Sequence, residues 1–168
     1  MARFPLALAA LVLVGSLAGC GMLNPFGKPD LTVLEVAGRY RVVEFRIDPV
    51  SEAVRDRDLL GDVLSRDATL LLREDGTAAM EVLRGERVDE TLSGGAYTVS
   101  GRTVTVRFSD ADALGRFLLP AEIRFDGDGQ ELSSEIFREG LNLEDISGDY
   151  RGITRADATL RIRLREIG

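Results

Sequence analysis

The feature that most constrains the fold of this chain is a period-two alternation of apolar and polar residues, repeated between short turns. Residues 160–165 alternate leucine or isoleucine with arginine, and residues 102–108 alternate valine or phenylalanine with threonine and arginine. Such alternation is typical of strands with one buried face. Glycine-containing turns at 74–76 and 126–129 join neighbouring runs and predict hairpins. The sequence therefore predicts about eight to ten short antiparallel strands.

One segment breaks this pattern. In residues 51–66 the apolar side chains recur at roughly helical spacing, and Ser51 stands where an N-cap is expected; these apolar residues are Val54, Leu59, Leu60, Val63 and Leu64. We predict one short helix here. Parallel strands would need a helical crossover after each strand, so a single helix argues against an α/β fold. The predicted fold class is all-β: a small antiparallel up-and-down barrel with one short helix near 51–66.

The composition removes most catalytic chemistry. The 168 residues contain no histidine and one cysteine, which excludes serine–histidine and cysteine–histidine pairs, histidine-containing zinc sites and an internal disulfide. Nothing in the spacing of the 28 acidic residues selects a carboxylate pair for hydrolysis. We predict no catalytic residue, no metal site and no cofactor, and we interpret the chain as a non-enzymatic binding protein.

The net charge is −7, from 28 acidic and 21 basic residues. Phosphate groups repel an acidic surface, so nucleic acid is not a predicted partner. Asp126-Gly127-Asp128-Gly129 resembles the start of a calcium loop, but with Asp126 as position 1 the sixth position is Glu131 instead of glycine and the twelfth is Phe137 instead of glutamate. A plain hairpin turn is the prediction there.

The N-terminal segment is typical of an export signal. Arg3 precedes an unbroken apolar run over residues 6–14, and the small residues Gly15, Ser16, Ala18 and Gly19 follow. The run is too short to span a bilayer, which needs about 20 residues. A cleaved signal-peptide helix is therefore the prediction for residues 1–19.

Leu17-Ala18-Gly19-Cys20 resembles the lipobox of bacterial lipoproteins. The resemblance implies cleavage before Cys20 and acylation of its thiol and new amino group, with palmitate among the chains, so that the protein is held in a membrane. Gly21, where aspartate would signal retention in the inner membrane, implies the outer membrane facing the periplasm. In a Gram-positive cell the anchor would lie on the outer face of the plasma membrane. The predicted organisation is a signal peptide at 1–19, a lipidated cysteine and tether at 20–35, and a barrel domain at 36–168.

The opening of the first predicted strand, Gly38-Arg39-Tyr40, is similar to the Gly-x-Trp motif of lipocalins, with tyrosine in place of tryptophan. The mid-chain Thr-Asp pair of that family is absent. The resemblance implies a lipocalin-like barrel in which Arg163 or Arg165 packs over Tyr40. Residues 160, 162 and 164 are the natural core face, so the alternation itself places these arginines outward, beside acidic neighbours.

A lipocalin-like barrel implies a small apolar or amphipathic ligand. The side chains predicted to point inward and contact it are Val43, Phe45, Tyr97, Val99, Val104, Val106 and Phe108. The alternative is a packed barrel that serves as an interaction or assembly module of the cell envelope, with an unknown protein partner. A cavity of some 300 Å³ inside the barrel would favour the ligand-binding hypothesis, and an interior without such a cavity would favour the interaction module.

Overall fold

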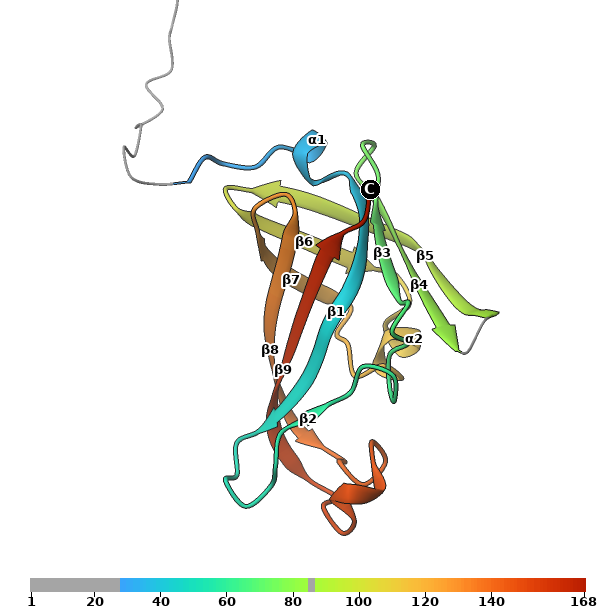
Figure 1. Ribbon diagram of the computed structural model, residues 1–168, viewed down its shortest axis with the longest axis vertical. Helices are drawn as coiled ribbons and strands as arrows, with labels where there is room; N and C mark the ends of the chain where they lie inside the picture. The colour runs from blue at the N-terminus through green and yellow to red at the C-terminus, as the bar shows by residue number, and fades with distance from the viewer. Residues whose placement is uncertain (1–27, 85–86) are drawn as a thin grey trace, which may run out of the picture.

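The strands form one antiparallel sheet that closes on itself (Figure 1). The computed structural model describes residues 28–84 and 87–168, and the side chains of these except in the stretch 82–93. Nine strands are present in the described residues: β1 (Gly38–Pro49), β2 (Arg57–Asp58), β3 (Thr69–Leu72), β4 (Thr77–Arg84), β5 (Arg87–Ser100), β6 (Thr103–Phe108), β7 (Glu122–Gly127), β8 (Glu131–Leu141) and β9 (Ala156–Glu166).

Pairing between the first and last long strands makes the barrel. From β3 to β9 each strand pairs with the next in chain order, and β1 pairs with β3 at its start and with β9 along most of its length. β2 is an extra two-residue strand against Arg46 and Ile47 of β1. The predicted all-β, up-and-down antiparallel barrel of eight to ten strands is confirmed.

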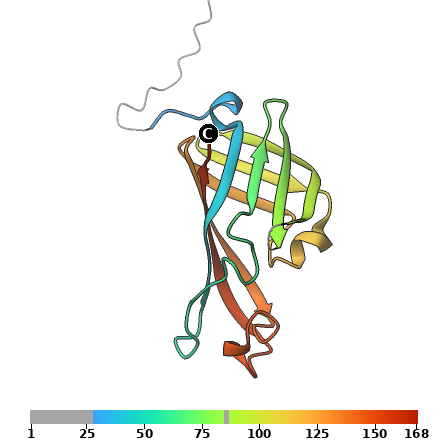
Figure 2. The same ribbon diagram turned by 45° about the vertical axis from the view of Figure 1, so that its right-hand side comes forward.

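Three long strands, β1, β8 and β9, continue beyond the barrel wall (Figure 2). β1, β8 and β9 have 11 or 12 residues, whereas β6 and β7 have 6. Figure 2 shows their far ends drawn out below the barrel as a twisted ribbon. The loop at 142–155, with the 3-10 helix η1 (Gly148–Tyr150), folds against the end of this ribbon. We call this end the tip.

The predicted helix at 51–66 is wrong. The segment contains β2 and a series of turns, and Gly61 has a φ of 104°, which an α-helix cannot hold. The amide of Leu59 donates to the carbonyl of Phe45, 2.7 Å away, and Leu59 and Leu64 are at most 1% exposed. The apolar residues at helical spacing are thus a plug for the barrel, and tertiary packing has overridden the local pattern.

Two short helices occur elsewhere in the described residues, α1 (Val33–Val36) and α2 (Ala111–Gly115). Thr32 and Glu35 form a capping box that fixes the start of α1. The amide of Leu31 donates to the carbonyl of Gly101 at 2.8 Å, and Val36 is fully buried. The packed domain therefore begins near Leu31, within the stretch assigned to the tether.

At Gly95 the wall of the barrel has no room for extra side-chain volume. A Cβ at Gly95 would lie 2.8 Å from the carbonyl oxygen of Ala78 and 2.8 Å from the ring of Phe108. Gly95 pairs with both of these residues across β4 and β6. We predict that Gly95→Ala lowers the free energy of unfolding by about 1–3 kcal/mol, because the neighbouring strand or ring must shift.

The matched control is Gly115→Ala in α2, where an added Cβ meets nothing within 4 Å. Alanine suits a helix better than glycine, so this variant should be neutral or more stable by about 0.5–1 kcal/mol. Urea unfolding of both variants checks the prediction. Equal destabilisation by the two substitutions would contradict the close approach at Gly95.

Candidate functional site

Most of the side chains predicted to point into the barrel do so. Phe45, Tyr97, Val104, Val106 and Phe108 are at most 6% exposed and belong to one core cluster. Val99 is half-buried and packs against that cluster. The alternation in β6 and β1 thus predicts the inner face correctly over most of its length.

Val43 is the exception, and its predicted inward position is wrong. A bulge between Val42 and Glu44 shifts the register of β1 against β9, so that the alternation slips by one residue. Val42 is 1% exposed and takes the core position, while Val43 is 36% exposed. Adjacent valines give no sequence signal for which of them turns inward.

The interior is filled. Its cavity measures about 20 Å³ and is lined only by apolar side chains from the wall and the plug, including Val42, Leu64, Met80, Phe125 and Ile162. A volume of this size holds about one water-sized sphere, whereas ligand pockets run from about 300 Å³ upward. The described side chains therefore leave no room for a small-molecule ligand.

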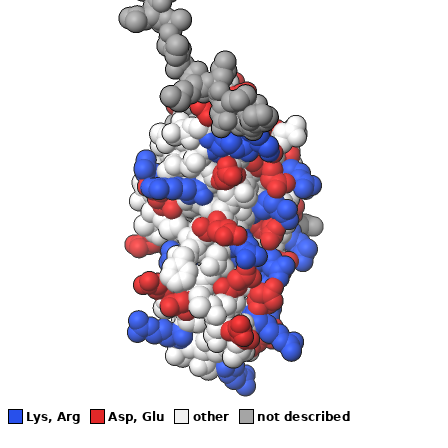
Figure 3. Space-filling view, turned by 90° about the vertical axis from the view of Figure 1, so that its left-hand side faces the viewer, with Lys and Arg blue, Asp and Glu red and all other residues white. Residues whose placement is uncertain are grey.

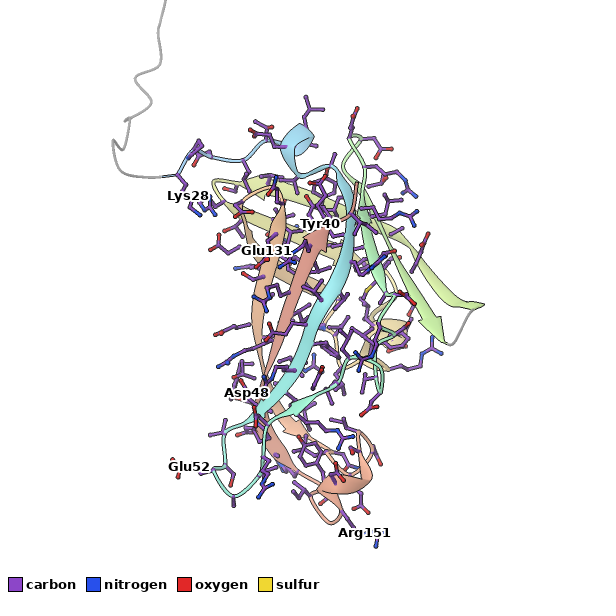
Figure 4. All side chains as sticks on the ribbon, in the orientation of Figure 1. Lys28, Tyr40, Asp48, Glu52, Glu131 and Arg151 are labelled. Atoms are coloured by element: carbon purple, nitrogen blue, oxygen red, sulfur yellow. The ribbon has the colours of Figure 1, made fainter. Side chains whose placement is uncertain are left out.

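Tyr40 closes the end of the barrel nearest α1. Its side chain is fully buried, and its hydroxyl donates toward the carbonyls of Val36, 2.9 Å away, and Gly129, 3.0 Å away. In Figure 4 the labelled Tyr40 lies at this upper end, below α1. One hydroxyl thereby ties α1 and the β7–β8 turn to the first strand.

The opposite end is closed by apolar side chains. Leu59 and Leu64 come from the segment after β1, and Leu114 and Leu119 come from α2 and the loop that follows it. All four are at most 2% exposed. With Tyr40 above and these leucines below, both mouths of the barrel are sealed.

Arg163 does not reach Tyr40. It lies on the outer face, 2.6 Å from Glu44 and 3.9 Å from Glu131. Arg161 is 3.0 Å from Asp48 and 3.3 Å from Glu135, and Arg165 is 3.4 Å from Glu131. The ladder faces solvent and pairs with acids on β1 and β8, as the alternation predicts, and the arginine–tyrosine packing implied by the lipocalin resemblance is not formed.

The larger hollows lie outside the barrel. An open groove of about 330 Å³ follows β8 and β9 and is lined by Asp126, Ser134, Glu135, Arg161 and others. A second, of about 470 Å³, lies at the tip between residues 53–57 and Tyr150. Sequence reasoning missed both, because each depends on how far strands and loops diverge in space.

The predicted lipidation site cannot be placed in the structure. The lipobox residues Leu17, Ala18, Gly19 and Cys20 lie outside the described residues. Residues 28–84 and 87–168 hold no cluster of metal-binding side chains. None of the helices described is long and apolar enough to cross a bilayer.

Comparisons with known proteins place the chain in no family. No protein-family model matches the sequence. A search of curated proteins finds no significant match. The functional argument therefore depends on the sequence and the geometry of this chain.

Burial raises the pKa of all three tyrosines of the chain, Tyr40, Tyr97 and Tyr150. Each hydroxyl donates to a backbone carbonyl, which only the protonated form can do. Above a pH of about 10 the unfolded chain loses phenolic protons that the native state keeps. We predict that the free energy of unfolding falls as the pH rises beyond that point.

Urea unfolding between about pH 8 and about pH 11 tests this, with tyrosinate absorbance recorded in parallel. In Tyr40→Phe the fall should be shallower, and the loss of the hydroxyl should cost about 1–2 kcal/mol at neutral pH. Full ionisation of the three tyrosines near pH 10 in a protein that stays folded with undiminished stability would contradict the buried hydrogen bonds.

Proposed function

We propose that this chain is a lipid-anchored protein of the bacterial cell envelope whose filled, lipocalin-like barrel acts as a non-enzymatic interaction or assembly module. The observation that carries the proposal is the filled interior, with its cavity of about 20 Å³. A barrel that stores no ligand still offers a rigid wall, and its outer surface is then the part available for function.

The lipobox supports the anchoring part of the proposal. The position of the first described residues indicates which end of the barrel would face the membrane. Lys28 lies at the α1 end of the barrel, and Glu52 and Arg151 lie at the opposite end (Figure 4). The eight steps from Cys20 to Lys28 reach at most about 28 Å. An acylated Cys20 would therefore hold the α1 end toward the bilayer and direct the tip away from it.

The alternative is a carrier of a small apolar molecule, as the lipocalin resemblance implies. The wholly apolar lining of the interior favours such a ligand chemically. The small volume of the interior argues against a ligand, because an occupant would have to displace packed side chains. We therefore rank the interaction module first.

Native mass spectrometry of the full-length protein, extracted gently from its own membrane, distinguishes the two. We expect the mass of the acylated polypeptide with no further small molecule, because the core has no room for one. A stoichiometric small-molecule adduct that survives extraction would contradict the filled barrel and favour the carrier. The same spectrum reads the acyl chains, which serve as an internal positive control for bound lipid.

The anchor is tested separately by Cys20→Ser. Without the thiol the acyl chains cannot be attached, so we expect the protein to lose its membrane association. Detergent partitioning and membrane fractionation measure this loss, with Ser16→Ala, in the same segment but outside the motif, as the control. Unchanged membrane association of Cys20→Ser would contradict lipidation at this residue.

A further inference from the structure

The barrel wall has an unpaired strand edge. β7 and β8 pair only at Asp126 with Ser133 and at Gly127 with Leu132. Beyond this point β7 continues to pair with β6, and β8 continues to pair with β9 as far as Leu141. Within the described part of the chain, residues 134–140 of β8 therefore have no strand partner on the β7 side; on the other side residues 134–138 pair with β9, and 139–140 lie in an irregularity of that pairing before Leu141. We call these residues the β8 edge.

The edge exists because the two strands lead in different directions. Figure 2 shows β8 and β9 following the long ribbon toward the tip, while the strands on the other side of the barrel are strongly tilted against them. The 330 Å³ groove begins near this point, at Asp126 of β7, and runs past Ser134 and Glu135 of β8 over β9 to Glu44 of β1. Every second residue of an edge strand directs its N–H and C=O outward, so the groove is bordered by backbone groups that can bind another strand.

The side chains along the edge have a defined chemical pattern. On the outer face β8 carries Glu135, Phe137 and Glu139 in alternate positions. The Phe137 residue is 57% exposed, one of few large apolar residues so exposed among those described. The carboxylate of Glu135 is 71% exposed although it meets Arg161, and no ion pair is formed by Glu139 among the described residues. The row thus presents acid, aromatic and acid to anything that pairs with it.

Figure 3 shows the side of the molecule that carries β7, β8 and β9. Acidic and basic side chains are interspersed over it, with uncharged surface between them, so no broad field of one sign covers this face. Recognition there depends on local pairing across strands, where opposite charges stabilise and like charges directly opposite destabilise.

We propose that the β8 edge is the docking surface for an extended segment of a partner protein, which adds to the barrel as a further strand and places a basic, an apolar and a basic residue opposite Glu135, Phe137 and Glu139. Main-chain hydrogen bonds would supply the affinity, and the acid–aromatic–acid row would supply the specificity. This inference rests on the proposed interaction role, for which it names the surface and the chemistry of the partner.

A second copy of the chain fits the edge poorly. Two copies of β8 can pair about a twofold axis only in registers that set residues of the same face opposite each other. The register that stacks Phe137 on its copy sets Glu135 opposite Glu139 twice. The neighbouring register sets Glu135 opposite Phe137 and Ser134 opposite Arg138, with no ion pair. The acids therefore disfavour self-pairing and favour a basic strand.

The binding test uses the full-length protein in nanodiscs and a synthetic peptide with the core Lys-Thr-Val-Thr-Lys, and a peptide of the same composition in scrambled order as control. We expect saturable binding of the first peptide, with slowed amide exchange confined to residues 134–140. In Glu135→Lys/Glu139→Lys the affinity should fall about tenfold, since two attractive pairs become repulsive. Glu52→Lys, an exposed acid at the tip, is the control for charge alone.

Two peptides methylated on alternate backbone amides test strand addition itself. Only one set of amides faces β8, so one methylated peptide should lose about tenfold or more in affinity and the other should bind as before. The docking surface would be overturned if the two methylated peptides bound equally well, or if the scrambled peptide bound as well as the first. It would also be overturned if slowed amide exchange appeared elsewhere than on β8.

Photo-cross-linking in cells separates this inference from the proposed function. A cross-linker at position 137 should give a protein adduct that disappears in Glu135→Lys/Glu139→Lys, and one at position 52 should not. Adducts only at position 52, or only to a second copy of the chain, would overturn the β8 edge and leave the interaction role in place. The absence of protein adducts at both positions and across the outer wall would overturn both.

Discussion

Closure of the sheet through β1 and β9 is the constraint on which the rest of the structure depends. β1 pairs with β3 at one end and with β9 along most of its length, so an up-and-down meander becomes a barrel without free strands at its two chain ends. An eight-stranded barrel is just wide enough for its own side chains to fill. Once closed, this barrel has an interior whose volume is fixed by the residues of the wall and by whatever seals the two mouths.

The two mouths are sealed by different means, and both come from segments that are not strands. Tyr40 joins α1 and the β7–β8 turn through its hydroxyl at one end. At the other, leucines from the segment after β1 and from α2 complete the core. The remaining cavity of about 20 Å³ is lined by inward side chains of the strands together with Leu64 and Leu119 of these plugs. A small antiparallel barrel can be hollow or filled, and in this chain the inward side chains of the wall and the plugs together occupy the inside.

The sequence predicts what depends on local alternation and fails where distant segments compete. The inner positions of β6 and the outward arginines of β9 follow from the pleat of single strands. The bulge at Val43 does not, because Val42 and Val43 are both apolar and only the pairing with β9 decides between them. Leu59 and Leu64 have helical spacing, yet their burial against the barrel is worth more than a marginal helix interrupted by Gly61. The separation of Arg163 from Tyr40 likewise depends on the register between β1 and β9, which the sequence of one strand alone does not determine.

The position of the β8 edge follows from the same closure. β8 pairs with β9 from Glu131 onward, and for two residue pairs it also pairs with β7 and completes the barrel. A strand cannot stay hydrogen-bonded to both neighbours when these neighbours diverge. One edge of β8 is therefore left without a partner. Recognition at such an edge uses backbone amides and carbonyls, and it needs none of the histidine or cysteine chemistry that the composition lacks. The scarcity of reactive side chains in this chain is therefore compatible with a specific binding role, because the binding groups are ones that every residue of β8 carries.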